Sequence, residues 1–175
     1  MRKLKLEELG RQSVETFKNT DKIPVIAVLD NIRSALNVGS VFRTADAFAI
    51  EGIIICGISA TPPNREITKT AIGATESVAW SYHKDIKEAV AGLKADGYTI
   101  IGIEQTTNSI SLDGFLPKRQ KIAVIFGNEV DGISDSIMED LDLALEIPQY
   151  GTKHSLNVAV CAGIVLWELS QKFLR

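Results

Sequence analysis

The sequence is poor in several residue types, and each shortage narrows what the protein can be. It has only two cysteines, Cys56 and Cys161, and both stand in apolar surroundings, so we expect core thiols rather than a disulfide or metal ligands. Basic residues are not in excess, because the net charge is −3, and binding of a polyanion would need a local basic patch. No apolar run reaches membrane-spanning length and no leader-like segment opens the chain, so we expect a cytoplasmic protein with no membrane partner.

The usual signatures of nucleotide and metal sites are also missing. No G-x-G-x-x-G follows the first expected strand and no G-x-x-x-x-G-K-[ST] occurs, which argues against a dinucleotide fold and against a flavodoxin-like or other nucleotide-binding module. Neither His83 nor His154 has metal-ligand spacing to a cysteine or to another histidine, so we expect no metal. His154 and Ser155 are adjacent in sequence, and such neighbours rarely face each other, which disfavours serine-hydrolase chemistry.

The composition that remains is that of one globular domain over residues 1–175. Hydrophobic residues make up 45% and charged residues 23% of the chain, which is enough for a core. Apolar runs alternate with helical periods, and this predicts an α/β domain with a mainly parallel sheet. Strands are expected at 25–30, 53–58, 80–82, 98–104, 121–126 and 143–148. Helices are expected at 41–50, 86–96, 135–141 and after 157, and residues 1–20 are expected to form a short amphipathic helix over the domain.

Residues 147–168 combine a polar loop with an unusual helix. From Val158 onward, apolar residues recur at the i, i+3, i+4, i+7 spacing of a buried helix face. The opposite side carries Val160, Ile164 and Trp167, so the helix is apolar nearly all round and needs cover on both sides. In a short chain the second cover is expected to come from another subunit, and we predict a homodimer through this helix.

Four polar segments follow strand ends, and ligands of open α/β sheets bind beyond the carboxyl ends of the strands. We therefore expect these segments to meet in one site: residues 30–39, 104–108, 127–134 and 148–155. Their residues also have ordinary structural interpretations. Asn37 and Ser155 could cap helices, and Gly127 and Gly132 could serve turns. Glu129 could pair with an arginine.

Three ordered blocks make the sequence similar to a known family. The blocks are NIRSALNVGSVFRTADAF, IFGNEVDGIS and IPQYGTKHSLNVAVCAGIVLWE. They resemble the motifs of the SpoU (TrmH-like) RNA 2′-O-ribose methyltransferases of the SPOUT superfamily, over about residues 24–172. The resemblance implies a sheet with helices on both faces and a C-terminal trefoil knot, although knots are otherwise almost absent from proteins. It also implies S-adenosylmethionine as cofactor and a homodimer through the last helix.

The resemblance further implies roles for individual residues. The catalytic group would be Arg43, Asn37, Ser155, Asn157 and Glu129. Contacts to the methyl donor would come from Glu104, Gln105, Gly127, Ile147, Ser155 and Leu156. Independently of the resemblance, we expect contacts to the RNA backbone from Arg33, Arg43, Arg65, Lys69, Arg119 and Lys153, with Arg2, Lys3 and Lys5 further out.

A guanidinium stays protonated at ordinary pH, so we interpret Arg43 as a group that holds a phosphate and stabilises the developing alkoxide. Asn37 and Asn157 would orient it, and Glu129 would fix an arginine. The implied reaction is methyl transfer to a ribose 2′-hydroxyl, which DNA lacks, with tRNA as the first choice of substrate and rRNA as the second. The alternative is a non-catalytic RNA-binding protein that kept the fold.

Overall fold

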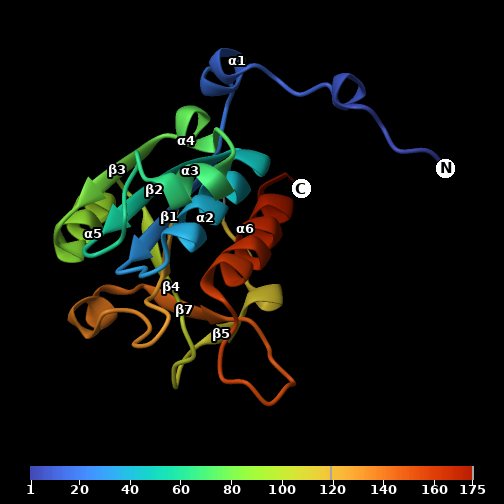
Figure 1. Cartoon of the computed structure of the whole chain (residues 1–175). Helices are drawn as coiled ribbons and strands as arrows, with labels where there is room; N and C mark the ends of the chain where they lie inside the picture. The colour runs from blue at the N-terminus through green and yellow to red at the C-terminus, as the bar shows by residue number, and fades with distance from the viewer. Residues whose placement is uncertain (119, 175) are drawn as a thin grey trace.

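A seven-stranded parallel sheet forms the centre of the computed structural model, which describes residues 1–118 and 120–174 (Figure 1). The strand order is β3-β2-β1-β6-β4-β7-β5, and each recorded strand pair is parallel. The strands are β1 (Ile23–Asp30), β2 (Ile50–Cys56), β3 (Trp80–His83), β4 (Thr99–Ile103), β5 (Ile110–Ser111), β6 (Ile122–Phe126) and β7 (Leu143–Glu146). Strands buried on both faces need continuous apolar runs, which explains the composition of β1 and β6. The predicted mainly parallel α/β fold is confirmed.

Helices cover both faces of this sheet. One face carries α2 (Ala35–Ala47), α3 (Arg65–Ala71), α4 (Ala74–Ser77) and α6 (Val158–Leu174), and the other carries α5 (Ile86–Ala95) and the 3-10 helix η3 (Asp135–Asp140). In β1, Leu29 belongs to the first buried cluster and Val28 to the second. Successive side chains of a strand point to opposite faces, so the sheet is buried on both sides. No helix of the described residues is long and apolar enough to cross a membrane.

The N-terminal segment differs from the single helix expected over residues 1–20. It forms two short helices, η1 (Leu6–Leu9) and α1 (Val14–Lys18). The part before α1 extends away from the sheet, whereas α1 contacts α4 (Figure 1). Gly10, at a φ of 59°, separates the two, because a left-handed residue ends a helix. Leu4, at 60% exposure, does not pack on the domain. The segment therefore does not form the covering helix that its apolar residues predict.

Residues 59–78 contain two helices where the sequence shows no clear period. Asn64 accepts hydrogen bonds from the amides of Glu66 (2.9 Å) and Ile67 (3.3 Å) and so begins α3. Ile72 and Gly73 then take left-handed conformations, with φ of 48° and 85°, between α3 and α4. Helices of seven and four residues are too short to show a hydrophobic period. Residues 59–78 therefore look irregular in sequence because their helices are short.

Helices α2 and α3 approach each other closely at Gly39. A Cβ atom on Gly39 would overlap Thr70 Oγ1 and the carbonyl of Ile67. We expect Gly39→Ala to push the helices apart and to lower the free energy of unfolding by about 1–3 kcal/mol, as measured by urea denaturation. Gly92 in α5 is the matched control, because a Cβ there has no atom within 4 Å, and Gly92→Ala should raise stability by about 0.5–1 kcal/mol. Similar stabilities for the two variants would contradict the close approach.

Candidate functional site

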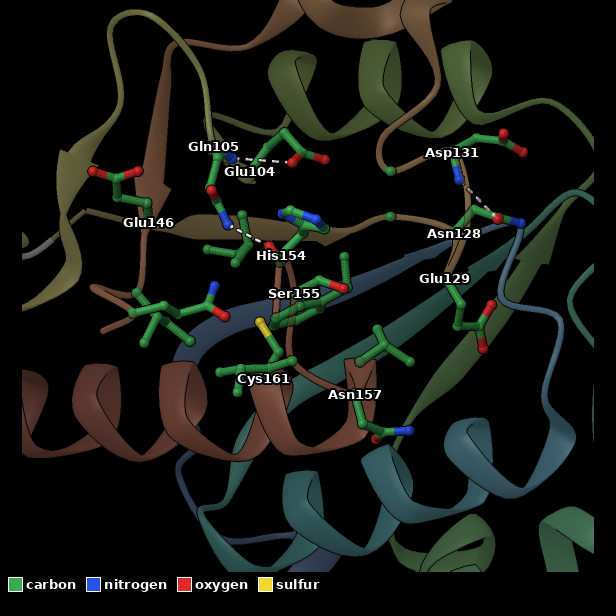
Figure 2. A pocket seen from close by; sticks show the side chains of 18 of the residues that line it. Glu104, Gln105, Asn128, Glu129, Asp131, Glu146, His154, Ser155, Asn157 and Cys161 are labelled. Carbon is green, nitrogen blue, oxygen red and sulfur yellow. Dashed lines mark hydrogen bonds between the residues drawn. The ribbon is translucent and has the colours of Figure 1, made fainter. Parts of the chain in front are cut away.

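A cavity of about 550 Å³ opens beyond the carboxyl ends of β4, β6 and β7, beside the start of α6 (Figure 2). Its walls come from three of the four polar segments expected to meet. They are drawn from residues 103–105, 126–132 and 145–161. The fourth segment, residues 30–39, does not line the cavity but is hydrogen-bonded to its wall.

The residues assigned to the methyl donor all lie in this wall. They are Glu104, Gln105, Gly127, Ile147, Ser155 and Leu156. Gln105 Nε2 donates a hydrogen bond of 3.0 Å to the carbonyl oxygen of His154, which ties the end of β4 to the C-terminal loop (Figure 2). Glu104 accepts hydrogen bonds from the amides of Gln105 (3.0 Å) and Ile133 (3.2 Å). Hydrogen bonds of the protein itself thus hold three distant segments around one space, and their contacts with a donor stay a prediction.

Gly127 is required by the turn that it opens. A Cβ on Gly127 would overlap the backbone of Gly132 and Ile133. Asn128 and Gly132 exchange two backbone hydrogen bonds, of 2.8 Å and 3.0 Å, which close the turn. The geometry therefore confirms that Gly127 serves a turn, whatever ligand the cavity holds.

Glu129 connects the cavity to α2. Its carboxylate accepts hydrogen bonds from the amides of Arg33 (2.9 Å) and Ser34 (3.3 Å) and from Asn37 Nδ2 (3.0 Å). Asn37 Oδ1 in turn accepts a hydrogen bond of 3.2 Å from Asn157 Nδ2. Three of the five residues assigned to catalysis thus form one hydrogen-bonded chain. The partner of Glu129 is the backbone amide of an arginine, not the guanidinium that we expected.

The helix caps also differ from those considered for the site residues. Ser34 caps α2 by accepting a hydrogen bond from the amide of Asn37. Asn157 begins α6, because its Oδ1 accepts hydrogen bonds from the amides of Ala159 (3.0 Å) and Val160 (3.3 Å). Asn37 therefore has its side chain free for Glu129 and Asn157. Ser155 lies in the cavity wall and does not cap the helix.

Arg43 lies apart from this hydrogen-bonded chain. It is exposed on α2, six residues after Asn37, and does not belong to the cavity wall. Six residues turn an α-helix through about 240° beyond a full turn, so the two side chains leave α2 in different directions. No hydrogen bond recorded among the described residues joins Arg43 to Asn37 or Asn157, so the expected orientation of Arg43 is not seen within one subunit.

The basic residues expected to contact RNA are spread over several elements. The exposed members are Arg33, Arg43, Arg65, Lys69 and Lys153. Arg2, Lys3 and Lys5 are exposed on the extended N-terminal segment. Arg119 lies outside the described residues. Each of the described positions is open to a polyanion, and their roles stay predictions.

Charge in the cavity is negative. Glu104, Glu129, Asp131 and Glu146 line it, and its described walls include no lysine or arginine. Such walls attract cations and repel phosphates. In the part of the chain that the structure describes, no three His, Cys, Asp or Glu side chains are grouped so that they could hold a metal ion.

Cys161 also lines the cavity. Burial, together with the negative charge of Glu104, raises the pKa of its thiol to about 11. Burial raises the pKa of Cys56 to about 12, with smaller contributions from Asp30 and Asp85. Both cysteines are free and stay protonated at neutral pH, so neither is a thiolate nucleophile.

Comparison with known proteins decides the family. A model of the SpoU rRNA Methylase family matches residues 24–167. The chain belongs to this family. One relative of this SpoU-family chain is the 23S rRNA (guanosine-2′-O-)-methyltransferase RlmB of Neisseria meningitidis serogroup B, which is 32% identical over 154 residues. The match covers 88% of this chain and 61% of the relative, so the chain spans about three fifths of the length of the curated relatives.

Solved structures share the fold. An AdoMet-bound rRNA methyltransferase from Sinorhizobium meliloti superposes with a TM-score of 0.80 at 24% identity, over 89% of this chain and 59% of that chain. The TrmH/SpoU tRNA modifying enzyme of A. aeolicus also gives a TM-score of 0.80, at 22% identity, over 91% of this chain and 80% of that chain. The fold of the SpoU-family chain is thus that of known SPOUT methyltransferases.

Several residues of the site lie inside the segments expected to meet, but no role was predicted for them there. Asp131 and His154 line the cavity, and Asp30, Asn128 and Ser134 join its wall to β1. One signal was present in the sequence, because Asp30 is a charged residue directly after the apolar run of β1. A charged side chain at that place is either exposed to water or bound by hydrogen-bond donors of another loop. Asp30 is fully buried, so the second alternative applies.

The pKa of Glu129 makes its hydrogen bonds testable by pH. Burial by itself would raise this pKa, but the donors at Arg33, Asn37 and Ser34 outweigh it and lower the pKa below its ordinary value. A carboxylate with a lowered pKa stabilises the fold above its unfolded pKa, and this contribution is lost as the pH falls through the folded pKa. We therefore expect the melting temperature of the wild type to fall more on acidification than that of Glu129→Gln. Glu139→Gln on η3 is the charge-matched control and should follow the wild type. Parallel curves for wild type and Glu129→Gln would contradict the role given to these donors.

Proposed function

We propose that this SpoU-family chain transfers the methyl group of S-adenosylmethionine to a ribose 2′-hydroxyl of RNA. The observation that carries the proposal is the cavity whose wall contains all six residues assigned to the donor. A volume of about 550 Å³ suits a ligand of nucleoside size. Ile147 and Leu156 offer apolar surface to an adenine ring, and the backbone around Gly127 offers polar groups to its edge.

The charge of the cavity also supports a sulfonium ligand. Its four carboxylates oppose ligands that carry phosphates, such as dinucleotides. The sulfonium of S-adenosylmethionine is positive, so the same carboxylates favour it. This property separates the proposed ligand from the anionic nucleotides that other α/β domains bind.

When bound, S-adenosylmethionine supplies an already activated methyl group, so the protein must align the acceptor hydroxyl and stabilise its oxygen while the hydroxyl proton passes to water. Arg43 holds a phosphate of the RNA and stabilises the alkoxide that develops at the 2′-oxygen. Glu129, Asn37 and Asn157 fix α2 against the cavity wall through their hydrogen bonds. Ser155, on the cavity wall, orients the ribose hydroxyl.

A homodimer explains how Arg43 could reach a cavity. Arg43 is outside the wall of its own subunit's cavity. α6 presents a stripe of exposed apolar side chains, with Val160 at 53%, Ile164 at 38% and Trp167 at 51% exposure. Uncovered apolar surface of this kind favours association. The proposed dimer covers the stripe and brings Arg43 of one subunit towards the cavity of the other.

The proposal extends to the domain, the knot, the RNA substrate and the cellular location. Residues 1–175 form one methyltransferase domain of the SpoU type, and the segment after Ile147 passes through the loop near Gly127 as a trefoil knot. The substrate is tRNA as first choice and rRNA as second, and the protein acts in the cytoplasm. The exposed residues Arg33, Arg65 and Lys153 supply contacts to phosphates.

Calorimetry with S-adenosylmethionine tests the proposal. We expect saturable binding to the wild type. ADP is the matched control, because it shares the adenosine but carries phosphates, and it should not bind the carboxylate-lined cavity. Absence of heat at millimolar S-adenosylmethionine would contradict the methyltransferase and favour the alternative, a non-catalytic RNA-binding protein.

A further inference from the structure

Asp30, at the end of β1, is a buried carboxylate with no assigned role. Its exposure is 0%, and no lysine or arginine is recorded as its ion-pair partner in the described part of the chain. Asp30 Oδ2 accepts a hydrogen bond of 2.7 Å from the amide of Ser134. Asp30 Oδ1 accepts hydrogen bonds from Ser134 Oγ (3.0 Å) and Asn31 Nδ2 (2.8 Å). A buried charge is tolerated when such donors satisfy it, and most of these donors belong to a distant loop.

Asn31 binds the beginning of the same loop, residues 127–134, at Asn128. Its carbonyl oxygen accepts a hydrogen bond of 2.7 Å from Asn128 Nδ2. Asn31 has a φ of 53°, a left-handed conformation that asparagine adopts more readily than most residues. Its Oδ1 also accepts a hydrogen bond of 3.1 Å from the amide of Ile58. The backbone of Asn31 is therefore fixed on the β2 side and presents its carbonyl to Asn128.

The loop held in this way is the wall of the cavity. Residues 127–132 all line it, and Figure 2 shows Asn128, Glu129 and Asp131 along one side of the cavity. The amide of Ile133 donates a hydrogen bond to Glu104, which follows the neighbouring strand β4. A shift of this loop would change the shape of the cavity and would also move Glu129, which holds the beginning of α2.

We propose that Asp30 and Ser134 are positioning residues for the methyl donor. With Asn31 and Asn128 they form a latch that holds residues 127–134 in the shape that lines the cavity. Asp30 and Ser134 do not line the cavity themselves, so they act through the loop. The identity of the ligand rests on the proposed function, whereas the latch rests on the hydrogen bonds alone.

Ser134→Ala removes the hydroxyl of the latch and keeps the amide. Ser77→Ala is the matched control, because Ser77 Oγ also donates to a carboxylate, that of Asp46, between α4 and α2 and away from the cavity. Hydrogen exchange of residues 127–133 is measured in the free protein, and the Kd for S-adenosylmethionine is measured by calorimetry. Loss of a hydrogen bond to a charged group is worth about a factor of ten, so we expect about tenfold faster exchange and about tenfold weaker binding in Ser134→Ala. Ser77→Ala should change neither, and Ser134→Thr, which keeps the hydroxyl, should restore both.

Each outcome decides a separate part of the inference. Unchanged exchange in the free Ser134→Ala protein would overturn the latch whatever the ligand is. Faster exchange with an unchanged Kd would overturn the positioning of the donor. Equal effects of Ser134→Ala and Ser77→Ala on the Kd would mean that lower stability of the whole domain weakens binding. That result would also overturn the positioning role of the latch. A wild type that binds no S-adenosylmethionine would contradict the proposed function, and the exchange result would still decide the latch.

Discussion

Replacing Arg43 by lysine is expected to lower the rate of RNA methylation by about 100-fold at saturating RNA, because removal of one group that stabilises a developing oxyanion has effects of this order. Lysine keeps the positive charge but loses the planar fork that binds phosphate through two hydrogen bonds. Arg43 is proposed to contact the RNA and not the donor, and it is outside the cavity wall of its own subunit, so the Kd for S-adenosylmethionine should stay unchanged. Single-turnover methylation and calorimetry measure the two quantities separately.

Arg65→Lys is the matched control for this substitution, since Arg65 is also an exposed arginine on a helix of the same face of the sheet, although it lies at the start of α3. It should change the KM for RNA slightly and leave the maximal rate intact. Near-normal turnover in Arg43→Lys would show that a simple positive charge is sufficient. The specific role of the guanidinium would then be wrong.

Ile164→Glu in the middle of α6 is expected to convert the proposed dimer to a monomer and to abolish methylation. A carboxylate buried without a partner costs several kcal/mol, and association should weaken by on the order of 100-fold or more. Analytical ultracentrifugation measures the mass. Ile58→Glu is the control, because Ile58 is a 71% exposed isoleucine on the loop after β2, and it should stay dimeric. A fully active monomer of Ile164→Glu would contradict the shared site.

Mixed dimers test whether Arg43 acts across the interface. Subunits with Arg43→Lys keep an intact cavity, and subunits with Leu156→Glu keep Arg43 but lose an apolar wall of the cavity. If the site is shared, a hybrid of the two contains one complete site, and mixing two inactive proteins should restore part of the activity. No recovery on mixing would place Arg43 in the site of its own subunit.

The sheet and the donor cavity could be predicted from the sequence because local patterns determine them. The apolar run of β1 requires burial on both faces, and the ends of parallel strands necessarily share one edge of the sheet. The residues after β4 and β6, Glu104 and Gly127, were therefore expected at the same edge, and the observed pairing of these two strands brings them close together. α6 and its buried face were likewise predictable, because apolar residues from Val158 onward recur at helical spacing.

Features that depend on contacts between distant loops were not predictable in this way. The partner of Glu129 is a backbone amide of another loop, and backbone donors leave no trace in a sequence. The latch pairs Asp30 with Ser134, which are separated by 104 positions, and neither residue type is unusual at a loop. The prediction of one helix over residues 1–20 was wrong for a local reason. An amphipathic pattern indicates which face of a helix is apolar, but it does not show whether the helix continues through Gly10.

Methylation of RNA ribose is tested most directly by mass spectrometry of nucleosides from RNA treated with the protein and with S-adenosylmethionine labelled in its methyl group. The RNA is taken from a strain that lacks this protein, so that its target nucleotides are unmodified. We expect the label in a 2′-O-methylated nucleoside, with tRNA labelled before rRNA, and about 100-fold less of it with Arg43→Lys. Label on a base, or no label in any RNA although the donor binds, would contradict the proposed ribose methylation.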